Sequence, residues 1–278
     1  MRPFVYDRVR PVLLYAVAAF FVAWTVAPVL WIGTMSVQPE INYVSVPPHL
    51  NVADISPRWY GEMLAQPDVS SALLNSLIIA SVTMVLCLLL GAIAAYPLSR
   101  LNMPRKNWFL TVSIVARMIP SMVLIIPMFL LMRQLHLLDT HLALIIVYTT
   151  FLLPYVIWML KNFFDHIPYA LEAAARMDGC TRLGALFRVM IPVAGPGVVA
   201  TAVFAFIGAW NEFLFGLILS TRLAVPITVK LSALVSSTFH SDTSLVAATG
   251  MLATIPVIAL VFVLNRYIVR GLVEGVKY

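Results

Sequence analysis

Charged residues are scarce in this sequence of 278 residues, where they make up only 11% of the chain. A soluble globular domain has about a quarter of its residues charged and about half of them apolar. Here 62% of the residues are hydrophobic, and the mean hydropathy is +0.95. This balance excludes an ordinary soluble domain and indicates a membrane protein.

Cysteine is nearly absent as well, with only Cys87 and Cys180 in the chain. Cys87 lies in an apolar run and Cys180 in a charged segment, so we expect them at different depths and unpaired. A disulfide framework is therefore excluded. The five histidines are scattered without the spacing of metal ligands, so we expect no metal site.

Motifs of catalysis and nucleotide binding are missing too. The sequence has no G-x-x-x-x-G-K-[ST] phosphate loop, no G-x-S-x-G turn and no G-x-G-x-x-G loop. We therefore expect no catalytic residues, no bound cofactor and no enzymatic activity in this chain. If ATP supplies energy, a separate subunit must bind it.

Long apolar runs dominate what is present. A membrane-spanning helix needs about 20 mostly apolar residues, and strands of a membrane barrel would instead alternate over about 10 residues. The runs do not alternate, so we expect an all-α polytopic membrane protein with six spans. The expected spans are 12–37, 72–98, 108–132, 142–160, 194–219 and 246–265.

The basic residues orient these spans. Thirteen Lys and Arg residues fall in the tails and loops of one side and four on the other. The positive-inside rule then places both termini and the loop at about 161–192 in the cytoplasm. We expect two parts: 1–71, with the cytoplasmic tail, first span and outer loop, and 72–278, the five-span core that contains this cytoplasmic loop.

The cytoplasmic loop carries an unusual segment, LEAAARMDGCTRLGALFRVMIPVAGP, at 171–196. Three alanines favour a helix, and Glu172 and Arg176 have the favourable i, i+4 spacing. Gly179 is a natural helix stop. Thr181 can cap a second helix, in which Leu183, Leu186, Phe187 and Met190 form one apolar stripe. The segment predicts a helix, a glycine bend and an amphipathic helix.

Two interpretations of this segment follow from the residues alone. One is a docking element, because the small alanine face lets another backbone approach closely. The other is an ordinary cytoplasmic loop with interfacial helices.

The same segment resembles the EAA loop of ABC-importer permeases. Gly179 matches the family's glycine, and Val189-Met190-Ile191-Pro192 matches its Ile-x-Leu-Pro ending with conservative changes. Ala173 stands at the family's glutamate position, and Glu172 lies one residue earlier, about 100° around the helix.

This resemblance implies that the segment is a coupling helix, which docks on an ATPase subunit. The ATPase would bind ATP and magnesium. The residues that the resemblance assigns to ATPase coupling are Glu172, Ala173, Ala174, Ala175, Arg176, Asp178 and Gly179.

Three further stretches resemble the second permease of maltose-type carbohydrate importers: 116–129, 208–219 and 265–278. The resemblance implies a homologous second permease, an ATPase dimer, an external substrate-binding protein approached by the loop 220–245, and a bacterial or archaeal plasma membrane. A glycerol-phosphate or other polyol importer is the alternative within the family. An ion-coupled secondary transporter is the alternative outside it.

Ionisable residues inside two spans are candidates for the substrate pathway. Arg117 lies near the middle of the third span, and Glu212 lies in the fifth with Trp210 and Asn211. Such groups usually face a bundle interior or a water-filled cavity. A depth difference of about 10 Å argues against a direct pair of Arg117 and Glu212. Structural roles for these residues, such as packing or a bond to backbone carbonyls, remain open alternatives.

Overall fold

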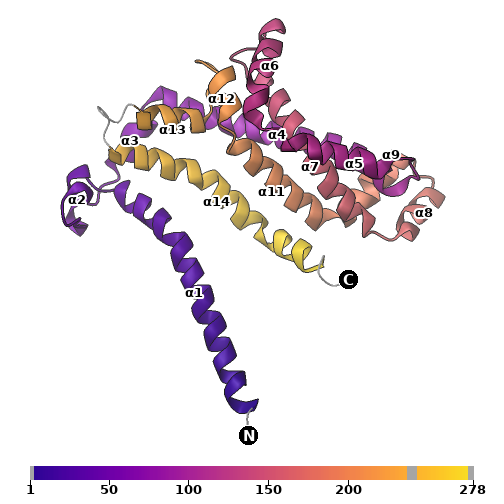
Figure 1. The fold of residues 1–278 in the computed structure, drawn as a ribbon, viewed down its shortest axis with the longest axis horizontal. Helices are drawn as coiled ribbons and strands as arrows, with labels where there is room; N and C mark the ends of the chain where they lie inside the picture. Colours follow the sequence, from indigo (N-terminus) through magenta and orange to yellow (C-terminus); the bar gives the residue numbers. More distant parts are fainter. Residues whose placement is uncertain (1–2, 237–242, 275–278) are drawn as a thin grey trace. The chain divides into compact units, whose positions relative to one another are not determined.

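The computed structural model describes residues 3–236 and 243–274 of the chain. Within those ranges every regular element is helical, which confirms the all-α prediction (Figure 1). The elements are α1 (Pro3–Met35), α2 (Glu40–Val44), η1 (Val52–Asp54), α3 (Arg58–Leu64), α4 (Pro67–Arg100), α5 (Lys106–Val115), η2 (Ala116–Met118), α6 (Ser121–Gln134), α7 (His141–Asp165), α8 (Tyr169–Met177), α9 (Arg182–Ala185), η3 (Leu186–Met190), α10 (Ile191–Val193), α11 (Gly195–Trp210), α12 (Leu214–Leu219), α13 (Ile227–Ser236) and α14 (Thr243–Glu274).

Four helices are long and apolar enough to cross a membrane alone: Pro11–Met35 of α1, then α4, α7 and Thr243–Leu264 of α14. The third predicted span is not one straight helix, because α5 with η2 and α6 meet at an angle of 93°. Pro120 lies at this bend and cannot donate an amide hydrogen to a continuous helix.

The fifth predicted span is also interrupted. Helix α11 ends at Trp210 and α12 begins at Leu214. A second sharp bend of 87° separates Arg182–Val193 from α11. Counting each bent pair as one span gives up to six spans.

The chain forms two compact units, each described here by itself. The first contains Met1–Pro67 and Leu231–Thr254. Its outer loop is folded rather than open: Asn42 Nδ2 donates to Asp54 Oδ2 over 2.9 Å, and the hydroxyls of Tyr43 and Ser244 lie 2.9 Å apart.

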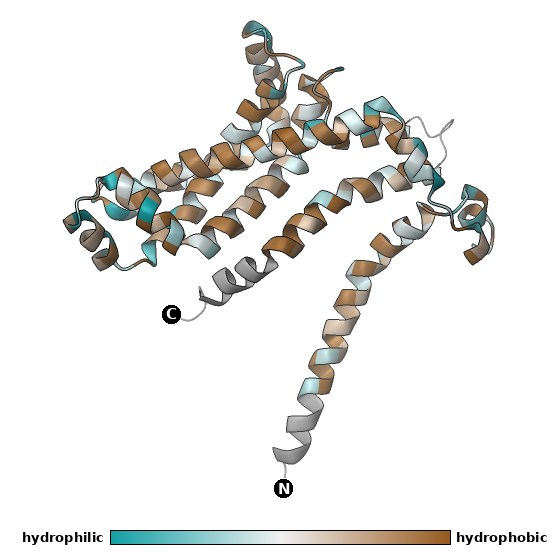
Figure 2. Cartoon of the chain, turned by 180° about the vertical axis from the view of Figure 1, so that it is seen from behind, coloured by the Kyte–Doolittle hydropathy of each residue, from teal (hydrophilic) through white to brown (hydrophobic). Residues whose placement is uncertain are grey.

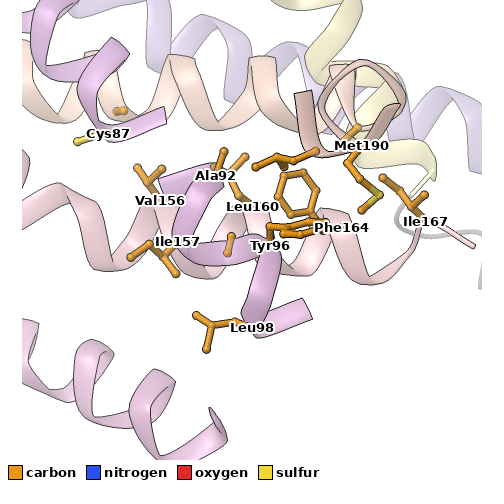
Figure 3. Packing of buried hydrophobic residues seen from close by; sticks show 14 residues of the cluster. Cys87, Ala92, Tyr96, Leu98, Val156, Ile157, Leu160, Phe164, Ile167 and Met190 are labelled. Carbon is orange, nitrogen blue, oxygen red and sulfur yellow. The ribbon is translucent and has the colours of Figure 1, made fainter. Parts of the chain in front are cut away.

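The second unit contains Asp68–Lys230 and Ile255–Tyr278. Its hydrophobic core lies where α4, α7 and η3 pack together; in Figure 3 the side chains of Tyr96, Leu160, Phe164 and Met190 lie close to one another. Figure 2 shows hydrophobic residues along the middles of the long helices and hydrophilic residues gathered at the end that carries α8 and α9. The loop that contains η3 is therefore attached to the spans through a packed core.

Helices α7 and α11 pack against each other in this unit. Gly197 of α11 is buried, and a Cβ added there would overlap the ring of Phe163. Small residues at such contacts let membrane helices approach closely and gain van der Waals contact.

We expect Gly197→Ala to destabilise the protein by about 1–3 kcal/mol, because the rigid Phe163 ring must move to admit the methyl group. Gly195→Ala is the matched control, since a Cβ there meets nothing within 4 Å. Thermal unfolding in detergent checks this difference. Equal melting temperatures for the two variants would contradict it.

Candidate functional site

Helix α8 is the short helix that the sequence predicts before Gly179. It begins after Pro168, and Gly179 ends it with a φ of +87°, a left-handed conformation that glycine adopts without strain. The Gly179 amide donates to the Arg176 carbonyl over 3.1 Å, and the Cys180 amide donates to the Ala175 carbonyl over 3.0 Å. These two bonds form a Schellman motif, which confirms the predicted glycine stop.

The residues of α8 divide into two faces. Glu172 and Ala175 are buried in the second unit, whereas Ala173, Ala174 and Arg176 are exposed. Asp178, just after the helix, is exposed too, and Met177 is 87% exposed. The three alanines thus do not share one face, because successive helical positions are about 100° apart.

Glu172 contacts α4 rather than Arg176. Its Oε2 lies 3.2 Å from Arg100 Nε, and its Oε1 accepts a hydrogen bond of 2.5 Å from the Tyr96 hydroxyl. Although Glu172 and Arg176 have the i, i+4 spacing, no ion pair joins them among the described residues. The reason is that the Glu172 side chain points inward, where a buried guanidinium is the nearer partner.

Arg100 joins this carboxylate to the end of α7. Its Nη2 donates to the carbonyls of Phe164 over 3.0 Å and Ile167 over 2.8 Å. Its guanidinium also lies 4.5 Å from the ring centre of Tyr169. Arg100 is a functional candidate that the sequence pattern does not predict, since it stands there only as one of the basic residues of the side assigned to the cytoplasm. The sequence feature that could have indicated this residue is an arginine one helical turn after Tyr96, at the end of an apolar run.

The second helix begins as predicted. The Thr181 hydroxyl accepts a hydrogen bond from the Gly184 amide over 3.1 Å, which is an N-cap. Its apolar stripe is divided: Leu186 and Met190 are buried in the core, whereas Leu183 and Phe187 are exposed. The loop therefore presents apolar side chains both to the spans and to its surroundings.

Arg117 lies at the bend between α5 and α6. It is exposed, and its guanidinium lies 5.6 Å from the ring centre of Tyr155 on α7. No ion pair joins Arg117 to Glu212, two residues that both lie in the described chain. A cation exposed at a helix bend within the membrane needs water, substrate or another subunit around it.

Glu212 fills the break between α11 and α12. Its carboxylate oxygens accept hydrogen bonds of 3.2 Å from the amides of Phe215 and Gly216, at the start of α12. The buried Tyr148 side chain lies beside this carboxylate. Asn211 is exposed next to it. Glu212 thus replaces the backbone partners that the helix break removes.

Trp210 is buried, with 3% of its surface exposed. Its ring stacks on Phe206 with centroids 5.6 Å apart. Of the four residues predicted for the pathway, Arg117 and Asn211 are therefore the exposed ones, and Trp210 packs within the chain.

At the opposite end of the second unit, Asp139 organises the loop between α12 and α13. Its carboxylate accepts hydrogen bonds from the four consecutive amides of residues 221–224. Burial raises the pKa of this carboxyl, but these amides outweigh burial and hold its pKa well below the ordinary range. Asn75 of α4 donates to the carbonyls of Leu223 and Val225. This stretch of the predicted outer loop 220–245 is therefore held in place; 237–242 lie outside the described residues.

Across the described ranges, no group of three or more His, Cys, Asp or Glu residues could hold a metal ion. The geometry is that of a helical membrane unit with a capped, two-faced helix presented at one end.

Comparison with known proteins identifies this architecture. Residues 87–274 match the family model described as the binding-protein-dependent transport system inner membrane component. The chain belongs to this family, and it is a multi-pass permease subunit of an ABC importer. The resemblance seen in the sequence is thereby confirmed.

Two relatives and one solved structure illustrate the match. The trehalose transport system permease protein of Mycobacterium tuberculosis is 37% identical, over 91% of this chain and 93% of that protein. The sulfoquinovosyl glycerol transport system permease protein of Agrobacterium fabrum is 32% identical, over 89% and 87%. The fold also matches a chain from a bacterial ABC transporter involved in alginate import, with a TM-score of 0.77, 24% identity and coverage of 94% and 97%.

We expect Asp139→Asn to lower the melting temperature at pH 7, because four amides lose a charged acceptor, at a cost of roughly 1–3 kcal/mol. The folded pKa is depressed, so this stabilisation is present above the ordinary aspartate pKa of about 3.9 and is lost as pH falls below it. The difference between wild type and variant should therefore shrink at pH 3. Thermal unfolding at both pH values measures it.

Asp165→Asn is the control for this measurement. Asp165 pairs with Lys161 at i, i+4 on an exposed surface, an arrangement worth only a few tenths of a kcal/mol. A pH-independent difference for Asp139→Asn would show that its carboxylate charge is not what holds the loop.

Proposed function

We propose that this chain carries a carbohydrate through the membrane as one permease of a complete importer. The complex would contain a homologous second permease, two ATPase subunits and an external substrate-binding protein. Two observations support this: the family is defined by dependence on a binding protein, and the relatives named above transport trehalose and sulfoquinovosyl glycerol. ATP and Mg²⁺ would be bound by the ATPase, and this chain would need no cofactor.

The geometry of α8 is the observation that carries the proposal. We assign the exposed Ala173, Ala174, Arg176 and Asp178 to contact with the ATPase, and Gly179 to the turn that holds them there. The buried Glu172 and Ala175 attach the same helix to the spans. One short helix would thus touch the ATPase on one face and the permease core on the other.

The proposed mechanism is alternating access driven by this helix. ATP binding closes the ATPase dimer and moves α8, and the spans open outward to receive the sugar. Hydrolysis and release of the products return them to the inward-facing state. The bend between α5 and α6 and the interruption between α11 and α12 give the spans places where segments can reorient without breaking further backbone bonds.

The distribution of Lys and Arg supports the orientation of the complex. The loop that carries α8 has Lys161, Arg176, Arg182 and Arg188, and so lies in the cytoplasm with both termini. The loop after α12, held by Asp139, then lies outside, where it would meet the binding protein. The membrane is proposed to be a bacterial or archaeal plasma membrane.

Arg117 and Asn211 are the proposed substrate contacts of this chain, because both are exposed at helix breaks. Their donors suit sugar hydroxyls. Stacking of Trp210 on a sugar would require its ring to leave Phe206. Glu212 supports the pathway as a cap of α12 rather than as an open carboxylate.

A phosphorylated polyol is the second candidate substrate, and the exposed guanidinium of Arg117 is the observation that favours it. Between residues 107 and 132 Arg117 is the only Lys or Arg, so a phosphate would need further cations from the second permease. The family match leaves an ion-coupled secondary transporter without support.

We expect Ala174→Arg to reduce co-purification of the ATPase at least tenfold, because a long charged side chain would replace a methyl group on the docking face. Asn102→Arg is the control, since it adds the same charge at an exposed residue of another cytoplasmic loop. Quantified pull-down of the detergent-solubilised complex measures the effect. Failure of the wild type to hold any ATPase would refute the proposed function.

A second experiment separates the two substrates. The reconstituted importer is supplied with labelled trehalose or glycerol 3-phosphate, and uptake by wild type and Arg117→Gln is compared. A neutral sugar predicts a loss of a few fold, because a neutral hydrogen bond is worth about 1 kcal/mol. Transport of glycerol 3-phosphate alone, with a loss of about a hundredfold in the variant, would establish the phosphate alternative.

A further inference from the structure

We propose that Arg100 is the positioning residue that transmits movement of helix α8 to spans α4 and α7. This inference rests on the proposed function, since it needs an ATPase that moves α8. Arg100 is not among the residues that docking itself would use, because its side chain is only 1% exposed.

The guanidinium connects three separate segments of the chain. Arg100 is the last residue of α4, its Nε lies 3.2 Å from Glu172 of α8, and its Nη2 donates to two carbonyls at the end of α7. The Phe164 carbonyl also accepts a hydrogen bond of 3.1 Å from the Ile167 amide, and Ile167 itself lies beyond Asp165, the last residue of α7. A single rigid, planar group therefore meets the ends of two spans and the coupling helix.

Tyr96 is a second residue of α4 that contacts Glu172 of α8. It precedes Arg100 by four residues, so both side chains project from the same face of the helix. Its hydroxyl donates to Glu172 Oε1, while Arg100 faces Oε2. Two side chains of α4 thus face the Glu172 carboxylate, Tyr96 through a hydrogen bond to one oxygen and Arg100 as the ion-pair partner of the other.

This connection resists separation more than the apolar contacts around it. Hydrogen bonds to charged groups are roughly twice as strong as neutral ones, and a buried charge that loses its partner is costly. Displacing α8 without α4 would leave the Arg100 and Glu172 charges buried and unpaired. The lower-cost movement carries α4 and the end of α7 along with α8.

Two other routes could carry the same movement and must be distinguished. Residues 166–168 join α7 to α8 covalently, and Leu186 and Met190 pack into the core beside α4 and α7. Substitution of Arg100 leaves both of these routes in place. A variant of Arg100 therefore tests the polar connection alone.

The experiment measures the opening of the spans through the accessibility of a residue in the break between α11 and α12. The complete complex is placed in nanodiscs with Asn211→Cys as an exposed reporter and Cys180→Ser to remove the accessible native thiol. Labelling of this subunit by a membrane-impermeant maleimide is compared with and without vanadate trapping of the ATPase. We expect trapping to change wild-type labelling several fold.

Arg100→Gln and Glu172→Gln are expected to retain the bound ATPase within twofold and to hydrolyse ATP, while the change on trapping falls at least fivefold. Arg188→Gln is the matched control, an exposed arginine of the same loop, and should behave as wild type. A purely structural role would instead lower ATPase association and thermal stability together. A full trapping response in Arg100→Gln would overturn the inference and leave the proposed function intact.

A second substitution at Arg100 keeps the inference testable if the first variant does not fold. If Arg100→Gln does not accumulate, Arg100→Lys keeps the charge but cannot bridge the carboxylate and both carbonyls. It is expected to accumulate and to lose more than half of the trapping response; an undiminished response would overturn the inference. A wild type that holds no ATPase, or shows no trapping response, would refute the proposed function and the inference with it.

Discussion

Backbone hydrogen bonding is the constraint on which this structure depends. Lipid offers no partner to a free amide or carbonyl, so a spanning segment must be helical and every break must be repaired from within the protein. The chain breaks its spans at Arg117 and at Asn211, and it ends them at buried places such as Phe164. Each break therefore needs a polar side chain at a defined point.

Charged side chains provide most of the hydrogen-bond partners at these breaks and helix ends. Glu212 accepts the amides at the start of α12, Asp139 accepts the amides of the loop after α12, and Arg100 donates to carbonyls at the end of α7. In each case the sign of the charge suits the helix or loop end that it meets. Arg117 differs, because it is exposed at its bend. That difference makes it the residue of this set with charge available to a substrate.

The proposed docking of α8 on an ATPase would need a short helix with two different faces. Helix α8 has nine residues, too few to be stable by itself, and it owes its position to Glu172, Ala175 and the Gly179 turn. The inward residues hold it to the spans, which leaves the outward alanines and Met177 for another protein. The coupling proposed for α8 would require both attachments at once, since a helix held on only one side transmits no movement.

The sequence alone determined the helical class, the approximate spans and the short helix that ends at Gly179, because apolar length, alanine and glycine act through local physics. Only the tertiary structure decided the partner of Glu172, since Arg100 lies 72 residues away in the chain and no local pattern joins them. It likewise decided that Trp210 is covered and that Arg117 is exposed, because burial depends on which helices meet.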